Sequence, residues 1–170
     1  MWWALIVVAG LGKSSLLPNC TDIDGHLIVP NGTVEIPDNK YKNCNSITGV
    51  TFNTDGALIK IGSAAFYGDS ASPFYGYNDI LSQLGGPLFI PKSVKEIKYI
   101  AFFKTKITSL VFEEGSQVSI IGFGVFNFCY NLTGAVKLPQ DVTEMYPSFG
   151  YTAIESIEIP QKTRLIHIEV

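Results

Sequence analysis

A recurring aromatic residue constrains the fold of this chain more than any other feature. Aromatic side chains spaced 25, 36, 24 and 23 residues apart stand at Tyr41, Phe66, Phe102, Phe126 and Phe149. Four or five positions before each of them is an aliphatic residue or methionine, namely Ile36, Ile61, Ile97, Ile121 and Met145. A fixed period of roughly 20–50 residues is typical of solenoids and other repeat proteins. The chain is therefore expected to fold as a stack of similar units.

Most of these aromatic residues are followed, five or six positions later, by a strand-like run. The runs read ITGVTF, ITSLVF and IESIEI, and the alternation at their ends predicts β-strands with one buried face. Proline ends several runs because it removes a hydrogen-bond donor from the ladder. The runs at 84–90 and 132–138 contain one residue more than the others, which predicts a β-bulge in each.

Stacking is what allows such short units to be stable. A unit of about 24 residues cannot bury its own apolar side, whereas a stack buries a continuous column. We therefore expect a β-rich solenoid with a parallel sheet, about five complete repeats and a partial sixth that begins at IPQKTRLIHIEV. The aromatic column should belong to the core, because the same buried slot recurs in each unit. Residues 20–170 then form one domain with an insertion at 67–86.

One unit shows a family resemblance. The stretch IPKSVKEIKYIAFFKTKITSLVF resembles the repeat of the BspA-like leucine-rich-repeat family. The residues in register with that repeat are Ile90, Pro91, Val94, Ile97, Ala101, Phe102, Ile107, Leu110 and Phe112. The unit VSIIGFGVFNFCYNLTGAVKLP matches it through Val118, Ile121, Phe126, Cys129 and Leu132.

The resemblance covers about residues 28–160, and its specificity comes from five in-phase copies. Pro37 and Lys40 depart from it in the first unit, where small residues are expected, and an insertion lengthens the second. It implies a right-handed leucine-rich-repeat coil of the kind found in surface proteins of bacteria and protists. Adhesion or ligand binding is the function that it implies.

The N-terminus contains an apolar block from Trp2 to Leu11. The block has about the length of a signal-peptide h-region and is too short to span a bilayer. We therefore expect residues 1–19 to be a secretory signal and the protein to be extracellular or at the cell surface. No Lys or Arg precedes the block, so two alternatives stay open: a reading frame begun at an internal methionine, and a hydrophobic N-terminal strand.

The charge and motif content of the chain disfavour several classes of binding partner. The chain has 12 basic and 15 acidic residues and no dense run of Lys or Arg, which disfavours a nucleic-acid or anionic-membrane partner. The stretch AGLGKSS is similar to a phosphate-binding loop, but Val7 stands where its first glycine belongs. Nucleotide binding is therefore not expected.

No catalytic or metal-binding set is evident either. Asp22 and Asp24 beside His26 supply too few oxygen ligands for calcium, so a solvated turn is expected there. His26 and His167 would lie at opposite ends of the stack, which leaves a catalytic triad without a place to assemble. We expect no enzyme, no metal and no cofactor.

The outward positions of the strand runs are the candidate binding face. Between the last two aliphatic residues of successive runs stand Thr51, Phe89, Val111, Lys137 and Glu158. This column is apolar in the middle and charged toward the C-terminal end. It favours a non-catalytic binding or adhesion module that contacts a protein or glycan, helped by the insertion. The aromatic residues of that insertion are Phe74, Tyr75 and Tyr77.

The alternative is a structural spacer, or a truncated fragment of a longer surface array, without a binding face of its own. In that case the outer face is simply mixed in composition and the insertion is a mobile loop. The sixth unit stops before its aromatic residue and its own strand run, so we expect self-association through this C-terminal end.

Sequons and cysteines complete the candidates. Asn31 and Asn131 are possible glycosylation sites, and Asn19 begins a third sequon. Cys44 and Cys129 occupy the same slot of the first and fourth units, about 14 Å apart if strands are spaced by ~4.8 Å. Because a disulfide requires Cα atoms within about 7 Å, these two should not pair with each other. Cys20 can at most pair with Cys44.

Overall fold

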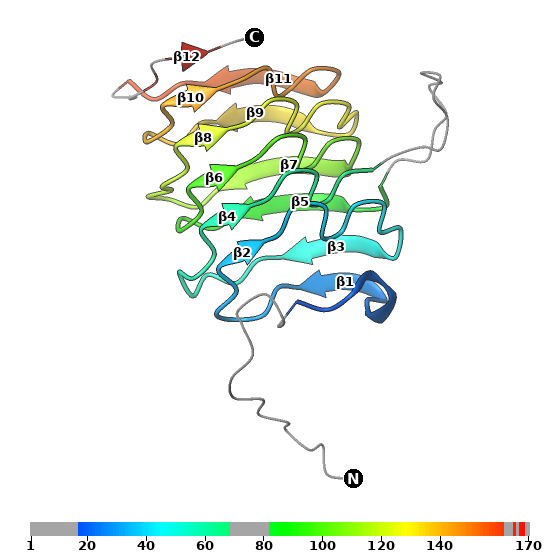
Figure 1. Cartoon of the computed structure of the whole chain (residues 1–170). Helices are drawn as coiled ribbons and strands as arrows, with labels where there is room; N and C mark the ends of the chain where they lie inside the picture. Colours follow the sequence, from blue (N-terminus) through cyan, green and yellow to red (C-terminus); the bar gives the residue numbers. More distant parts are fainter. Residues whose placement is uncertain (1–16, 69–81, 162–164, 166, 169–170) are drawn as a thin grey trace.

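The computed structural model describes residues 17–68, 82–161, 165 and 167–168 of the 170-residue chain. The backbone coils through stacked turns, each with one longer strand on one side and a two-residue strand on another (Figure 1). The longer strands are β1 (Gly25–Ile28), β3 (Ile47–Thr51), β5 (Gly85–Ile90), β7 (Lys106–Phe112), β9 (Thr133–Lys137) and β11 (Ala153–Glu158). The short strands are β2 (Glu35–Ile36), β4 (Lys60–Ile61), β6 (Glu96–Ile97), β8 (Ile120–Ile121), β10 (Glu144–Met145) and β12 (His167–Ile168). The predicted parallel β-solenoid is confirmed.

The two kinds of strand pair differently. The short strands form one continuous parallel sheet in the order β12-β10-β8-β6-β4-β2. The longer strands form three parallel pairs, β1–β3, β5–β7 and β9–β11, rather than one continuous ladder. The side that carries the longer strands is therefore interrupted between β3 and β5 and between β7 and β9.

Each pair of longer strands contains a register shift. The shifts fall between Gly25 and His26, between Gly86 and Pro87, and between Ile154 and Ser156. The last two lie in the pairs that contain the runs with an additional residue, where bulges were predicted. The unpaired residues are on the partner strands, however, at Thr48, Thr108 and Glu155. A bulge disturbs the ladder locally and bends its strand.

Turns, not strands, form the third side of the coil. We call this side the turn face; it comprises residues 38–43, 62–68, 98–104, 122–128 and 146–151. Its segments stack through backbone hydrogen bonds such as Phe66 N–H to Ala101 O (2.8 Å) and Phe102 N–H to Val125 O (2.9 Å). Several residues here have positive φ, including Ala64 (52°) and Ile100 (48°). This left-handed backbone lets every second N–H point toward the next segment.

The aromatic column lies inside the coil, as predicted. Consecutive ring centroids are 5.3 Å (Tyr41–Phe66), 5.2 Å (Phe66–Phe102), 5.6 Å (Phe102–Phe126) and 5.3 Å (Phe126–Phe149) apart. The first four side chains are at most 2% exposed. Burial raises the pKa of Tyr41 to about 12. The stacked rings and the buried aliphatic residues that precede them share the core with buried residues of the longer strands, such as Leu88 and Leu110.

A disulfide closes the N-terminal end of the coil. Cys20 and Cys44 are bonded, with a Cα–Cα distance of 5.7 Å, so the pairing that the sequence left open is present. The segment around Cys20 is a short 3-10 helix, Cys20–Asp22, flanked by the buried side chains of Leu17 and Ile23. The hydroxyl of Tyr41 donates to Pro18 O (3.4 Å). This segment covers the first unit of the core.

Cys129 is free and buried, and it is not linked to Cys44, as predicted. Its Sγ donates a hydrogen bond to Phe102 O (3.1 Å) and lies 3.2 Å from Thr105 Oγ1. Thr105 and Thr152 occupy the position equivalent to Cys129 in the units before and after it. Each hydroxyl donates a hydrogen bond to the carbonyl three residues earlier. Burial raises the pKa of the Cys129 thiol to about 11, as is typical of a cysteine that packs in a core.

Candidate binding face

The predicted outward side chains form a column on the face of the longer strands. Thr51 lies in register with Ile28, Phe89 with Val111, and Glu158 with Lys137. All five predicted side chains are exposed, including the apolar Phe89 (42%) and Val111 (50%). The order is therefore apolar in the middle and charged toward β11, as the sequence indicates.

Ile28 of β1 extends this column by one strand, and the repeat pattern did not predict it. Its side chain is 64% exposed, while its neighbours Leu27 and Val29 are each 1% exposed. The first turn of the coil has no aromatic residue before its strand, so a search by aromatic period passes over it. The alternation of buried and exposed apolar residues in HLIV was the signal that could have identified this rung.

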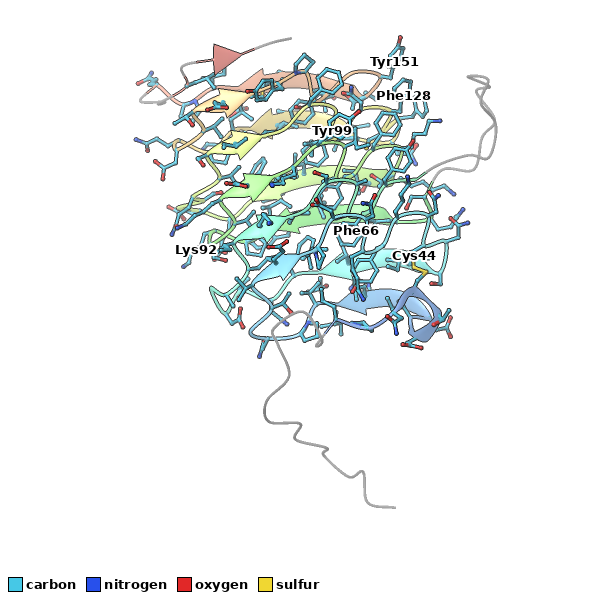
Figure 2. All side chains as sticks on the ribbon, viewed as in Figure 1. Cys44, Phe66, Lys92, Tyr99, Phe128 and Tyr151 are labelled. Carbon is cyan, nitrogen blue, oxygen red and sulfur yellow. A yellow bond between two sulfur atoms is a disulfide. The ribbon has the colours of Figure 1, made fainter. Side chains whose placement is uncertain are left out.

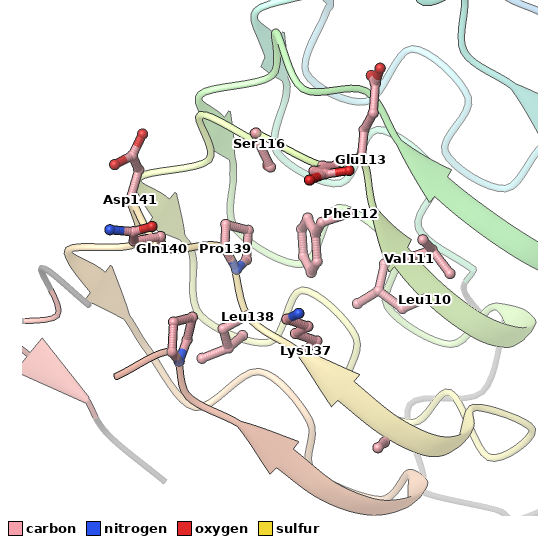
Figure 3. A pocket seen from close by; sticks show the side chains of 14 residues that line it. Leu110, Val111, Phe112, Glu113, Ser116, Lys137, Leu138, Pro139, Gln140 and Asp141 are labelled. Atoms are coloured by element: carbon pink, nitrogen blue, oxygen red, sulfur yellow. The ribbon is translucent and has the colours of Figure 1, made fainter. Parts of the chain in front are cut away.

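A groove opens where the ladder of longer strands is interrupted between β7 and β9 (Figure 3). Its volume is about 810 Å³. The lining comes from the end of β7 and the loop after it, from the end of β9 and the loop after it, and from Pro160. Val111 and Lys137, two of the five predicted face residues, line the groove. Thr51, Phe89 and Glu158 do not.

The groove combines an apolar part with a charged rim. Apolar lining is supplied by Val111, Phe112, Leu138 and Pro139. The charged lining residues are Lys137, Glu113, Glu114 and Asp141. The Glu113 carboxylate is held by Lys92, whose N–H donates to Oε2 (2.8 Å) and whose ammonium lies 3.8 Å from Oε1. An amphipathic ligand with a basic or mixed polar edge suits this lining.

The other candidate residues are not brought together with the groove. Asp22 lies in the 3-10 helix, where its Oδ2 accepts from Asn19 N (3.3 Å), and His26 Nε2 lies 2.8 Å from Thr51 Oγ1. In the described part of the chain, no group of three or more His, Cys, Asp or Glu could hold a metal ion. Phe74, Tyr75 and Tyr77 of the insertion fall outside the described residues.

The two sequon asparagines considered for glycosylation are both exposed. The Thr33 hydroxyl of the Asn31 sequon is buried and donates to Pro30 O (2.7 Å). The Thr133 hydroxyl of the Asn131 sequon is exposed and donates to Thr108 O (3.4 Å). Glycosylation at either position stays a prediction. No helix among the described residues has the length and apolar character that crossing a membrane requires.

A coil of parallel short strands, stacked rings and one longer strand per turn defines the class of leucine-rich-repeat solenoids. The chain belongs to the BspA-type leucine-rich-repeat family, whose model matches residues 14–84 and 86–169 in six copies. Such repeat modules commonly serve in binding at surfaces, and the fold is typically a non-catalytic scaffold. Neither the comparison with curated proteins nor the comparison with solved structures returned a match.

Proposed function

We propose that this chain is a non-catalytic binding module that holds a segment of a protein ligand against the face of the longer strands. The observation that supports this proposal is the groove between β7 and β9, which opens within the face that the sequence singles out. An extended segment could place apolar side chains on Val111 and Phe112 and polar groups near Lys137 and Glu113. Strand edges next to pockets for alternate side chains are a common mode of peptide recognition.

The disulfide supports an extracellular or cell-surface location for this module. Structural disulfides persist in oxidising compartments and are rare in the reducing cytosol. Cys20 and Cys44 form such a bond at the N-terminal end of the core. A secreted adhesion module fits this chemistry, and the contribution of the 67–86 insertion to adhesion stays a prediction.

The first test is the double variant Phe89→Ala, Val111→Ala in a screen of displayed peptides. We expect peptides selected on the natural chain to bind the variant at least about tenfold more weakly, since exposed apolar side chains are the usual anchors of an interface. Melting temperature should change little, because both side chains are about half exposed. The matched control is Ile59→Ala, which truncates an exposed aliphatic side chain away from this face.

Two results would contradict the proposal. Equal loss of peptide binding in the Ile59 control would show that the selected peptides do not use the face of the longer strands. Loss of the circular dichroism spectrum in the double variant would show that Phe89 and Val111 support the core. A chain that selects no peptides, and whose double variant behaves like the natural chain in every binding assay, favours the alternative of a structural spacer.

Self-association through the C-terminal end also stays a prediction. Ile159 is exposed and Ile154 and Ile157 are only partly buried on β11, the outermost of the longer strands described. We expect the sedimentation coefficient to rise with concentration and the rise to disappear when a polar capping unit is appended. A chain that stays monomeric at every concentration, with or without the cap, would refute this expectation.

A further inference from the structure

The turn face concentrates positive charge on an acidic protein. Its five segments contain Lys40, Lys42, Lys98 and Lys104 but only one acidic residue, Asp38, in a chain of net charge −3. The Asp38 carboxylate accepts a hydrogen bond from Ser63 N (2.7 Å). The lysines come from the first and third segments, so no linear window of the sequence contains them together. The fold gathers them on one side.

A second aromatic column runs along the same side, outside the core. Ring centroids are 5.1 Å apart for Tyr67 and Phe103, 5.1 Å for Phe103 and Phe128, and 4.5 Å for Phe128 and Tyr151. Tyr67, Phe103 and Phe128 are partly exposed and Tyr151 is 64% exposed. Figure 2 shows Phe128 and Tyr151 together at the edge of the coil. We call these four residues the outer column.

Two lysines contact the outer column. Lys42 Nζ lies 5.0 Å from the Tyr67 ring centroid, and Lys104 Nζ lies 6.0 Å from that of Phe103. Tyr99 and Phe123 stack 6.1 Å apart elsewhere on the turn face and are 54% and 49% exposed. Aromatic residues that repeat once per rung, beside ammonium groups, therefore form an extended surface separate from the groove.

We propose that the turn face binds an acidic polysaccharide that lies along the axis of the solenoid. Rings that recur about every 5 Å offer one apolar contact per rung, which suits the C–H groups of successive sugar units in an extended chain. Lys42 and Lys104 then pair with carboxylate or sulfate groups on that chain. A ligand that repeats in one dimension matches a surface that repeats in one dimension.

Ring orientation favours a polysaccharide over a single-stranded nucleic acid. Bases bind to single-strand-binding proteins by stacking on open aromatic faces. In the outer column, the rings of Tyr67 and Phe103 are inclined by 14° and those of Phe128 and Tyr151 by 13°, so the two rings of each pair cover each other's faces, whereas Phe103 and Phe128 are inclined by 56°. A base could insert within either pair only by separating rings that are already stacked, whereas a sugar chain that lies along the outside of the column leaves both stacks in place.

The test compares binding of the full chain to immobilised dextran sulfate and to uncharged dextran. We expect binding to dextran sulfate that weakens as salt rises and no binding to uncharged dextran. The double variant Lys42→Glu, Lys104→Glu should bind at least about tenfold more weakly. The control Lys60→Glu, Lys95→Glu makes the same change in net charge on the side of the short strands and should stay within about twofold. Equal losses in both variants would overturn the proposal, because binding would then follow net charge alone.

The contribution of the outer column must be tested separately, because a surface on which only the lysines contributed would bind polyanions without regard to their sugar units. Tyr151→Ser should weaken binding measurably and leave the melting temperature nearly unchanged, since the side chain is mostly exposed. Phe128→Ser with Tyr151→Ser should weaken it further. Unchanged binding in both ring variants would overturn the proposal, as would tighter binding of a single-stranded oligonucleotide than of dextran sulfate.

Discussion

Replacing Phe102 by alanine is expected to lower the free energy of unfolding by about 3–5 kcal/mol, the usual cost of removing a fully buried phenylalanine side chain. Phe102 is 0% exposed and stacks between Phe66 and Phe126, at 5.2 and 5.6 Å. The cavity left by the missing ring should stay open, because backbone hydrogen bonds between successive turn segments fix the distance between them. For a chain of this size the melting temperature should fall by roughly 10 °C.

Phe103 is the matched control for this experiment, since it is the next residue and the same type of side chain. Phe103 belongs to the outer column and is partly exposed. Phe103→Ala should therefore cost only about 1–2 kcal/mol, by loss of stacking and partial burial. Urea unfolding monitored by circular dichroism measures both values. Equal costs for the two variants would mean that the inner column is not what holds successive units together.

The period in the sequence predicted the inner column because burial imposes the same requirement on every unit. An aliphatic residue such as Ile97 and an aromatic residue such as Phe102 each face the interior, so an apolar residue recurs at the corresponding position of every unit. The outward residues Phe89 and Val111 were predicted for the same reason, as the positions between buried ones. Fold and candidate face both follow from this alternation.

The groove and the turn face could not be predicted from the sequence in the same way. The groove depends on where the ladder of longer strands is interrupted, and the repeat pattern does not distinguish the strands that pair from those that do not. The turn face depends on Lys42 meeting the ring of Tyr67 in the next unit, whereas Lys104 meets the ring of its sequence neighbour Phe103. The contact between units comes from left-handed backbone positions and from the stacking of segments, and the residues at those positions differ in type from unit to unit.

The disulfide is the second feature whose removal should have a large effect. The bond joins residues 24 positions apart, and closing a loop of that length in the unfolded chain contributes about 3 kcal/mol. It also holds the segment that covers the first unit, where Ser46 Oγ donates to Cys20 O (2.9 Å). We expect the double variant Cys20→Ser, Cys44→Thr to unfold at a markedly lower urea concentration. Threonine is the fitting replacement at 44, because Thr105 and Thr152 occupy the same slot in other units.

Reduction of the natural chain offers an independent measurement of the same bond. Adding a reductant should shift the unfolding midpoint of the natural chain toward that of the double variant, and should leave the midpoint of the double variant unchanged. The variant Cys129→Ala controls for the third cysteine and should respond to the reductant as the natural chain does. The thiol of Cys129 is buried with a pKa near 11, so it should react with a thiol reagent only after unfolding. If the reductant leaves the midpoint of the natural chain in place, Cys20 and Cys44 do not stabilise the N-terminal end, and the packing of Leu17 and Ile23 alone must cover the core there.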